Sequence, residues 1–234
     1  MFWFSKKPTV VLECFTYEGH IADEYPIVEA SKAVPEWFSN MKGDYLFNDF
    51  IPRATVKKCP AIVKNITSGI IMPIWSDLAL KNNTETQEYF WAFSDGTNCE
   101  PHDREQWDAF KNPNEVVHLK LLSPWRFRTK QDIKFLWQKP YYHKTNPHLD
   151  IVQGIDCYQH THATTINCFI DITKDFKTLI RAGSPLVHLI PLSDSHIKIK
   201  NIVISKEEWL KLDTPKSTFL GRHKKAAKCP FHRK

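Results

Sequence analysis

Short apolar segments separated by turn residues fill most of the chain between residues 116 and 204. They are rich in Val, Ile, Phe and Trp, the residues that favour strands, and comprise Val116–Leu122, Trp125–Thr129, Ile133–Trp137, Thr164–Ile172, Leu186–Pro191 and Ile197–Ile204. In the last segment, Ile197 and Ile199 alternate with Lys198 and Lys200, which is the period of a half-buried strand. Many short strands with few helices predict a mainly β (α+β) fold with an antiparallel β-sandwich or jelly-roll-like core.

Further segments add strands and helices around this core. Thr9–Tyr17 predicts a first strand, and Glu88–Phe93 another. Short helices are expected at Pro35–Met41, where Pro35 favours a helix start, and at His102–Phe110, where Trp107 and Phe110 would share one face. Ser205, followed three residues later by Glu208, is a capping box and predicts a C-terminal helix.

The charge of the chain is concentrated at its C-terminal end. The whole chain has 32 Lys and Arg against 26 Asp and Glu, a net charge of +6. All of this excess is accounted for by six residues of the tail, Arg222, Lys224, Lys225, Lys228, Arg233 and Lys234. We therefore predict one β-rich domain over residues 1–212, with an N-terminal elaboration, and a basic, flexible tail over residues 213–234.

These charges and the hydropathy limit the classes of partner. The neutral body does not favour a basic nucleic-acid-binding face, whereas the tail predicts contact with nucleic acid or with an acidic protein surface. No apolar run approaches the ~20 residues that span a bilayer, so no membrane association is expected. The order of the N-terminal residues, aromatic before Lys6 and Lys7, is not that of a cleaved signal peptide.

Six sequence blocks occur in an order that resembles a known family. They are Val34–Trp37, Lys57–Pro60, Ser68–Asp77, Ser123–Thr129, Gly154–Asp156 and Gly183–Pro191. Together they resemble an uncharacterised protein family of tailed bacteriophages, especially cyanophages, and they span roughly residues 34 to 191 of this chain. The resemblance implies a phage origin, a location in the host cytoplasm or the virion, and no catalytic residues.

The Gly, Pro and Trp residues of these blocks have a structural explanation. Gly154 and Gly183 can adopt positive φ in turns, and Pro185 suits the start of a strand. The leading hypothesis is therefore a non-enzymatic binding or assembly protein, either a virion component or a host-directed factor. Its expected partner is a phage structural protein or a host protein.

The alternative hypothesis is a non-haem Fe(II) oxygenase that uses 2-oxoglutarate. His148-x-Asp150 places two metal-ligating side chains on one face of a strand, and a distant His196 would complete a two-histidine, one-carboxylate site for Fe(II). Lys206 would bind the co-substrate carboxylate, in a role for which Arg is better suited.

Two other histidine patterns are incomplete. His160 and His162 resemble half of a cupin metal motif whose downstream Glu is missing. Cys229 and His232 in the tail are half of a zinc site, to which His223 could add a ligand.

Overall fold

The computed structural model describes residues 8–97, 99–159 and 162–213. Within them the chain is mainly β, with several antiparallel sheets and a few short helices, so the predicted fold class is confirmed. No helix among the described residues is long and apolar enough to cross a membrane.

One sheet brings the two ends of the described chain together. Its strands are β10 (Arg126–Arg128), β1 (Thr9–Thr16) and β17 (His196–Val203), in that order. Strands β1 and β17 are parallel over their whole length, whereas β1 and β10 are antiparallel. The predicted first strand is therefore confirmed, and the last strand stabilises it.

Three antiparallel sheets form the rest of the body. The five-stranded sheet has the order β13 (Gly154–Cys157), β11 (Lys134–Gln138), β16 (Pro185–Pro191), β5 (Ile70–Pro73) and β2 (Val28–Glu29). The four-stranded sheet is ordered β12 (Leu149–Ile151), β14 (Ile166–Asp171), β9 (Val116–Leu121) and β8 (Cys99–Pro101). The third has β15 (Phe176–Ile180), β6 (Leu78–Asn83) and β7 (Glu88–Phe93).

Apolar side chains from these four sheets meet in a single cluster, which runs in sequence from Val10 to Ile197. Its largest fully buried members are Trp75, Trp125, Tyr158, Phe127 and Phe135. Fully burying one large apolar side chain contributes about 1.5–3 kcal/mol to folding. The aromatic residues of the sequence blocks thus stabilise the core.

The helices are short. Their bounds are α1 (Gly19–Glu24), η1 (Ala30–Lys32), α2 (Glu36–Asn40), η2 (Val56–Lys58), α3 (Pro60–Thr67), η3 (Arg104–Gln106) and α4 (Lys206–Asp213). The capping box before α4 is present: the Glu208 N–H donates to Ser205 Oγ at 3.2 Å, and the Ser205 N–H donates to Glu208 Oε2 at 3.1 Å. Helices α2 and α4 confirm the sequence prediction.

The helix predicted over residues 102–110 is wrong. Only the 3₁₀ turn η3 forms, followed by turns. Trp107 is half-buried against Phe169, with ring centroids 5.2 Å apart, whereas Phe110 is exposed. This tertiary contact outweighs the weak helical preference of a segment flanked by Pro101 and Pro113.

Of the two glycines expected at positive φ, one meets the expectation. Gly183 has φ +83 in the turn before β16, whereas Gly154 is not among the residues of positive φ and lies in strand β13.

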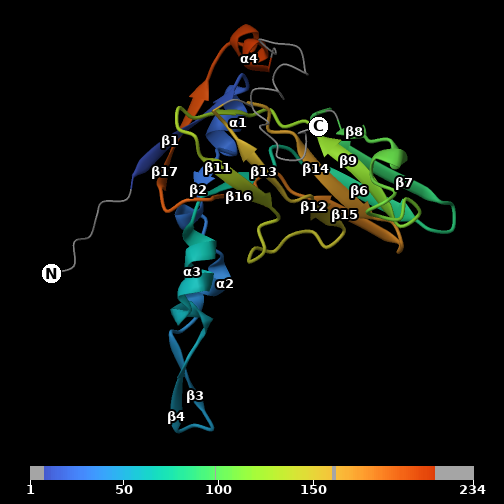
Figure 1. Cartoon of the computed structure of the whole chain (residues 1–234). Coiled ribbons are helices and arrows are strands. Elements are labelled where there is room, and N and C mark those ends of the chain that lie inside the picture. Colours follow the sequence, from blue (N-terminus) through green and yellow to red (C-terminus); the bar gives the residue numbers. More distant parts are fainter. Residues whose placement is uncertain (1–7, 98, 160–161, 214–234) are drawn as a thin grey trace, which may run out of the picture.

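A projection leaves the body away from the sheets (Figure 1). It consists of α2, η2 and α3 near the body and of the hairpin β3 (Asp44–Phe47) and β4 (Ile51–Ala54) at its end. We call the hairpin and its turn, Asp44–Ala54, the arm. The arm forms a two-stranded sheet of its own.

Candidate functional site

The arm exposes apolar side chains on both of its faces. Every residue of β3 and β4 is exposed. Tyr45 and Phe47 pair with Arg53 and Ile51 on one face, while Leu46 lies on the other. Since an isolated hairpin is marginally stable in water at best, this much exposed apolar surface is unusual for a hairpin whose strands pair, among the described residues, only with each other.

The turn of the arm holds an aromatic residue at the tip. Asn48 and Asp49 have φ values of 50 and 62, the left-handed region that Asn and Asp tolerate. The Phe50 N–H donates to Phe47 O at 3.4 Å and closes the turn. Phe50 is 86% exposed, the highest value among the large apolar side chains of the described residues.

Hydrogen bonds fix the base of the arm. Lys57 Nζ donates to Ser39 O at 2.7 Å and to Met41 O at 2.8 Å. Thr55 Oγ1 donates to Lys42 O at 2.7 Å. These bonds join the two segments that flank the arm, the one that enters from α2 and the one that leaves towards α3.

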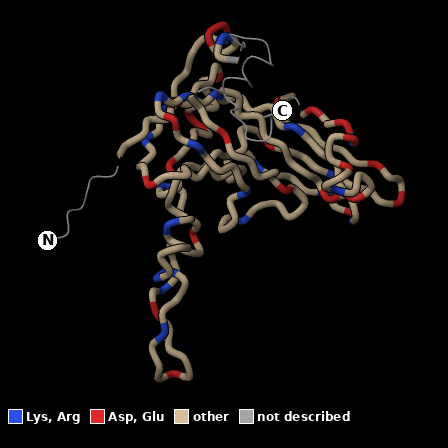
Figure 2. The backbone as a smooth tube through the Cα atoms, viewed as in Figure 1, with Lys and Arg blue, Asp and Glu red and all other residues tan. Residues whose placement is uncertain are grey.

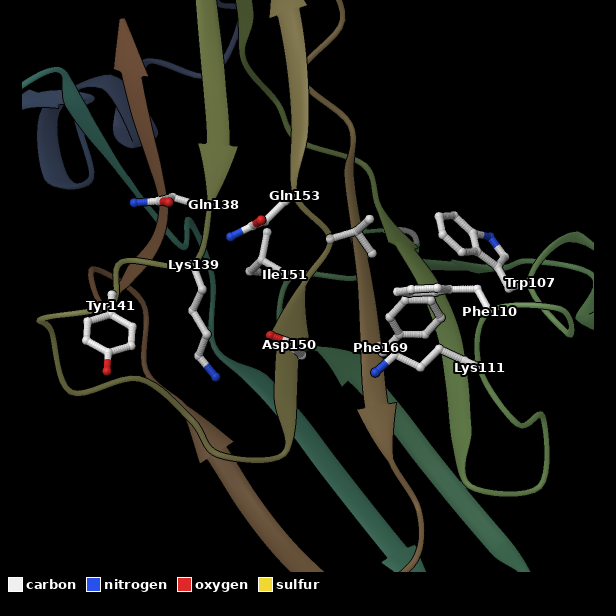
Figure 3. Close-up of a pocket in the computed structure, with 11 residues that line it drawn as sticks. Trp107, Phe110, Lys111, Gln138, Lys139, Tyr141, Asp150, Ile151, Gln153 and Phe169 are labelled. Carbon is white, nitrogen blue, oxygen red and sulfur yellow. The ribbon is translucent and has the colours of Figure 1, made fainter. Parts of the chain in front are cut away.

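A groove of about 570 Å³ opens on the body, beside strand β12 (Figure 3). It contains aromatic, amide and charged side chains from β11, β12, β14 and the segment after η3, namely Trp107, Phe110, Lys111, Gln138, Lys139, Tyr141, Asp150, Ile151, Val152, Gln153 and Phe169. This volume lies within the range of about 300–1,000 Å³ that is usual for ligand pockets.

One side of the groove is an aromatic wall made of Trp107, Phe110 and Phe169. The Phe110 and Phe169 ring centroids are 6.3 Å apart, and Lys111 Nζ lies 5.5 Å from the Phe110 centroid. Phe110 is 68% exposed, and Tyr141, on the opposite side in Figure 3, is 81% exposed. The groove thus presents uncovered aromatic surface at both sides.

Polar groups line the middle of the groove. Lys139 Nζ donates to the carbonyl oxygens of Asn146 at 2.9 Å and Leu149 at 2.7 Å. Burial lowers the pKa of Lys139, and the carboxylate of Asp150 partly offsets this effect. Gln138 and Gln153 lie together at the other end of the groove and offer donors and acceptors (Figure 3).

Behind the aromatic wall, two histidines stack. The rings of His102 and His118 lie 4.3 Å apart, and Trp107 packs edge-on against His118 at 4.6 Å. Burial, and secondarily the neighbouring His102, lowers the pKa of His118 to about 4. His118 is therefore neutral near pH 7 and acts as part of the aromatic packing.

The structure does not bring the predicted iron ligands together. His148 stacks on Phe176 with centroids 4.0 Å apart, and Asp150 lines the groove on β12. His196 begins β17 in a different sheet, paired with Thr9. Among the described residues, no group of three or more His, Cys, Asp or Glu side chains is placed to hold a metal ion. Asp150 lies on β12, but His148 lies in the turn before this strand, and long-range strand pairing places His196 in another sheet.

The other predicted site residues are also apart or outside the described part of the chain. Lys206 Nζ lies 5.4 Å from the ring centroid of Tyr17. His162 Nδ1 is 2.9 Å from Phe127 O, and its partner in the cupin pattern, His160, lies outside the described residues. The six basic tail residues, with His223, Cys229 and His232, lie outside them as well.

No protein-family model, curated protein or solved structure matches the chain. The sequence analysis had predicted neither the arm nor the groove. For the arm, a signal was present: the Asn48-Asp49 pair lies between two apolar segments, which is typical of a hairpin turn. The groove has no such signal because its lining comes from separate elements.

Proposed function

We propose that the protein is a non-enzymatic binding or assembly protein of a tailed bacteriophage, which docks on another protein subunit through its arm. The observation that carries the proposal is the exposure of Leu46, Phe47, Phe50 and Ile51 on an element that contacts no core. A partner that covers them would remove apolar surface from water, at about 25 cal/mol per Å².

The composition of the arm supports a protein partner. Exposed aromatic residues such as Tyr45, Phe47 and Phe50 are the type that anchors protein interfaces. Charged residues concentrate nearer the body, where Lys58 pairs with Asp44, and the tip has a single acid, Asp49 (Figure 2). An apolar centre with a charged rim is the usual anatomy of such an interface.

The phage setting rests on the ordered blocks between Val34 and Pro191. It includes a role as virion component or host-directed factor, in the host cytoplasm or the virion. The basic tail adds a second contact, to nucleic acid. A chain ending at Leu220 should lose salt-sensitive binding to a mixed-sequence DNA duplex, and unchanged binding would remove the tail from this role.

Site-specific photo-crosslinking tests the arm. A benzophenone amino acid replaces Phe50 in the full chain, and Phe90, which is 54% exposed on β7, provides the matched control position. In infected host cells we expect a discrete adduct from position 50, lost with Leu46→Ser and Ile51→Ser, and none from position 90. The same weak adducts from both positions would contradict the proposal.

A further inference from the structure

Among the described residues, the arm tip and the groove both expose aromatic side chains, and the two surfaces are opposite in shape. The arm tip is convex, with Phe50 at its end, and the groove is concave, with Phe110 and Tyr141 at its sides. In one molecule they lie apart, because the arm points away from the sheet that holds β12 and β14 (Figure 1). Resting on the proposed function of the arm, we infer that the arm tip of one copy docks in the groove of a second copy.

Size supports this assignment. The groove of about 570 Å³ is open to solvent and has room for an aromatic side chain together with the residues beside it. The ring of Phe50 would lie against the aromatic wall and cover Phe110. Gln138 and Gln153 would then face the exposed backbone of the Asn48-Asp49 turn, whose amide groups they can bind.

Charge supports it as well. Between Leu46 and Pro52 the arm has one charged side chain, the acid Asp49. The groove has two lysines, Lys111 and Lys139, against one acid, Asp150. Lys111 is placed on the aromatic wall, where Asp49 would arrive with the tip. The opposite net charges favour this approach and disfavour an arm-to-arm contact between two Asp49 residues.

The contact joins two different patches and is therefore head-to-tail. Such contacts build closed rings or open chains, since one copy of a docked pair keeps a free groove and the other keeps a free arm. A tip in a groove buries less than the ~1,200 Å² of a standard interface. We therefore expect reversible association that grows with concentration.

Sedimentation velocity of the purified full chain tests the inference, between about 5 and 500 μM, the range in which weak contacts are populated. We expect species larger than a dimer at the upper end. Phe50→Ser and Phe110→Ser should each weaken association at least about tenfold, as interface anchors do. Phe90→Ser, an exposed aromatic on β7 outside both surfaces, should leave it unchanged.

Mixing the two defective chains separates this contact from others. The Phe50→Ser chain keeps its groove and the Phe110→Ser chain keeps its arm, so their mixture should form dimers that neither chain forms alone. Asp49→Lys and Lys111→Glu should each weaken association about two- to fivefold, the range of an exposed ion pair, and their combination in one chain should restore it.

Three results would overturn the inference. The first is a wild-type chain that stays monomeric over the whole concentration range. The second is association that Phe50→Ser weakens but Phe110→Ser does not. The third is association that Phe90→Ser weakens as much as these two substitutions do. A monomeric chain that still gives a discrete crosslink from position 50 to another protein would leave the proposed function standing. If the chain neither associates with itself nor gives a discrete crosslink from position 50, both the inference and the proposed function are wrong.

Discussion

The hairpins β6–β7 and β3–β4 have the same local architecture and opposite environments. Both are antiparallel pairs that contain aromatic and aliphatic residues. In β6–β7, a third strand, β15, pairs with β6, and one face packs into the core through Leu78, Leu80 and Phe93. Among the described residues, no third strand pairs with the arm, and every residue of β3 and β4 is exposed. Strand formation and burial are thus separate properties, and only the second stabilises the body.

A matched pair of leucines gives the largest expected difference between the hairpins. Leu80→Ala removes a side chain that is 1% exposed, and we expect it to lower the free energy of unfolding by about 2–5 kcal/mol. Leu46→Ala, at a position that is 62% exposed, should change it by less than about 0.5 kcal/mol. Urea denaturation of dilute protein measures both. Equal losses would show that the arm is packed against the body.

Lowering the pH should destabilise the body through its buried histidines, which the arm lacks. The pKa of His118 lies at about 4 in the folded chain, below its ordinary value of about 6.5, so the unfolded chain binds the proton first. The stability that this group contributes is complete above pH ~6.5 and is lost as the pH falls towards about 4. The arm contains no histidine.

His118→Phe keeps an aromatic ring against Trp107. It should make the free energy of unfolding depend less on pH between about 4 and 6.5. Some slope remains because burial also lowers the pKa values of His143 and His188. Urea denaturation at several pH values between 4 and 7 measures the effect, which we expect to be smaller than that of Leu80→Ala. A variant whose curve equals that of the wild type would contradict the assignment.

The turns of the two hairpins give the smallest expected difference. Gln87, before β7, has φ 56, a conformation that costs a long side chain free energy and that glycine adopts freely. Gln87→Gly should therefore be neutral or stabilise the protein by up to about 1 kcal/mol. Asn48→Gly should have almost no effect on the thermal midpoint, since Asn tolerates φ 50 and the arm contacts no core. A larger change in the thermal midpoint from Asn48→Gly than from Gln87→Gly would contradict this expectation.

Features governed by neighbours in sequence were predicted well. The capping box Ser205–Glu208 starts α4, Pro35 precedes α2, and the strand predicted over Thr9–Tyr17 forms β1. Each depends on hydrogen bonds or side-chain directions within a few residues, so its signal is local. The mainly β fold class follows from the sum of such signals.

The burial of each side chain and its packing partners could be established only from the tertiary structure. Tyr45-Leu46-Phe47 has the composition of a core strand, yet no sheet of the body pairs with it and it is exposed. His148 and Asp150 have the spacing of metal ligands, yet sheet pairing places His196 elsewhere. Trp107 and Phe110 have the i, i+3 spacing of one helix face, yet no α-helix forms there and Trp107 packs on Phe169. In each case contacts between residues distant in sequence decided the outcome, because their free energies exceed local preferences.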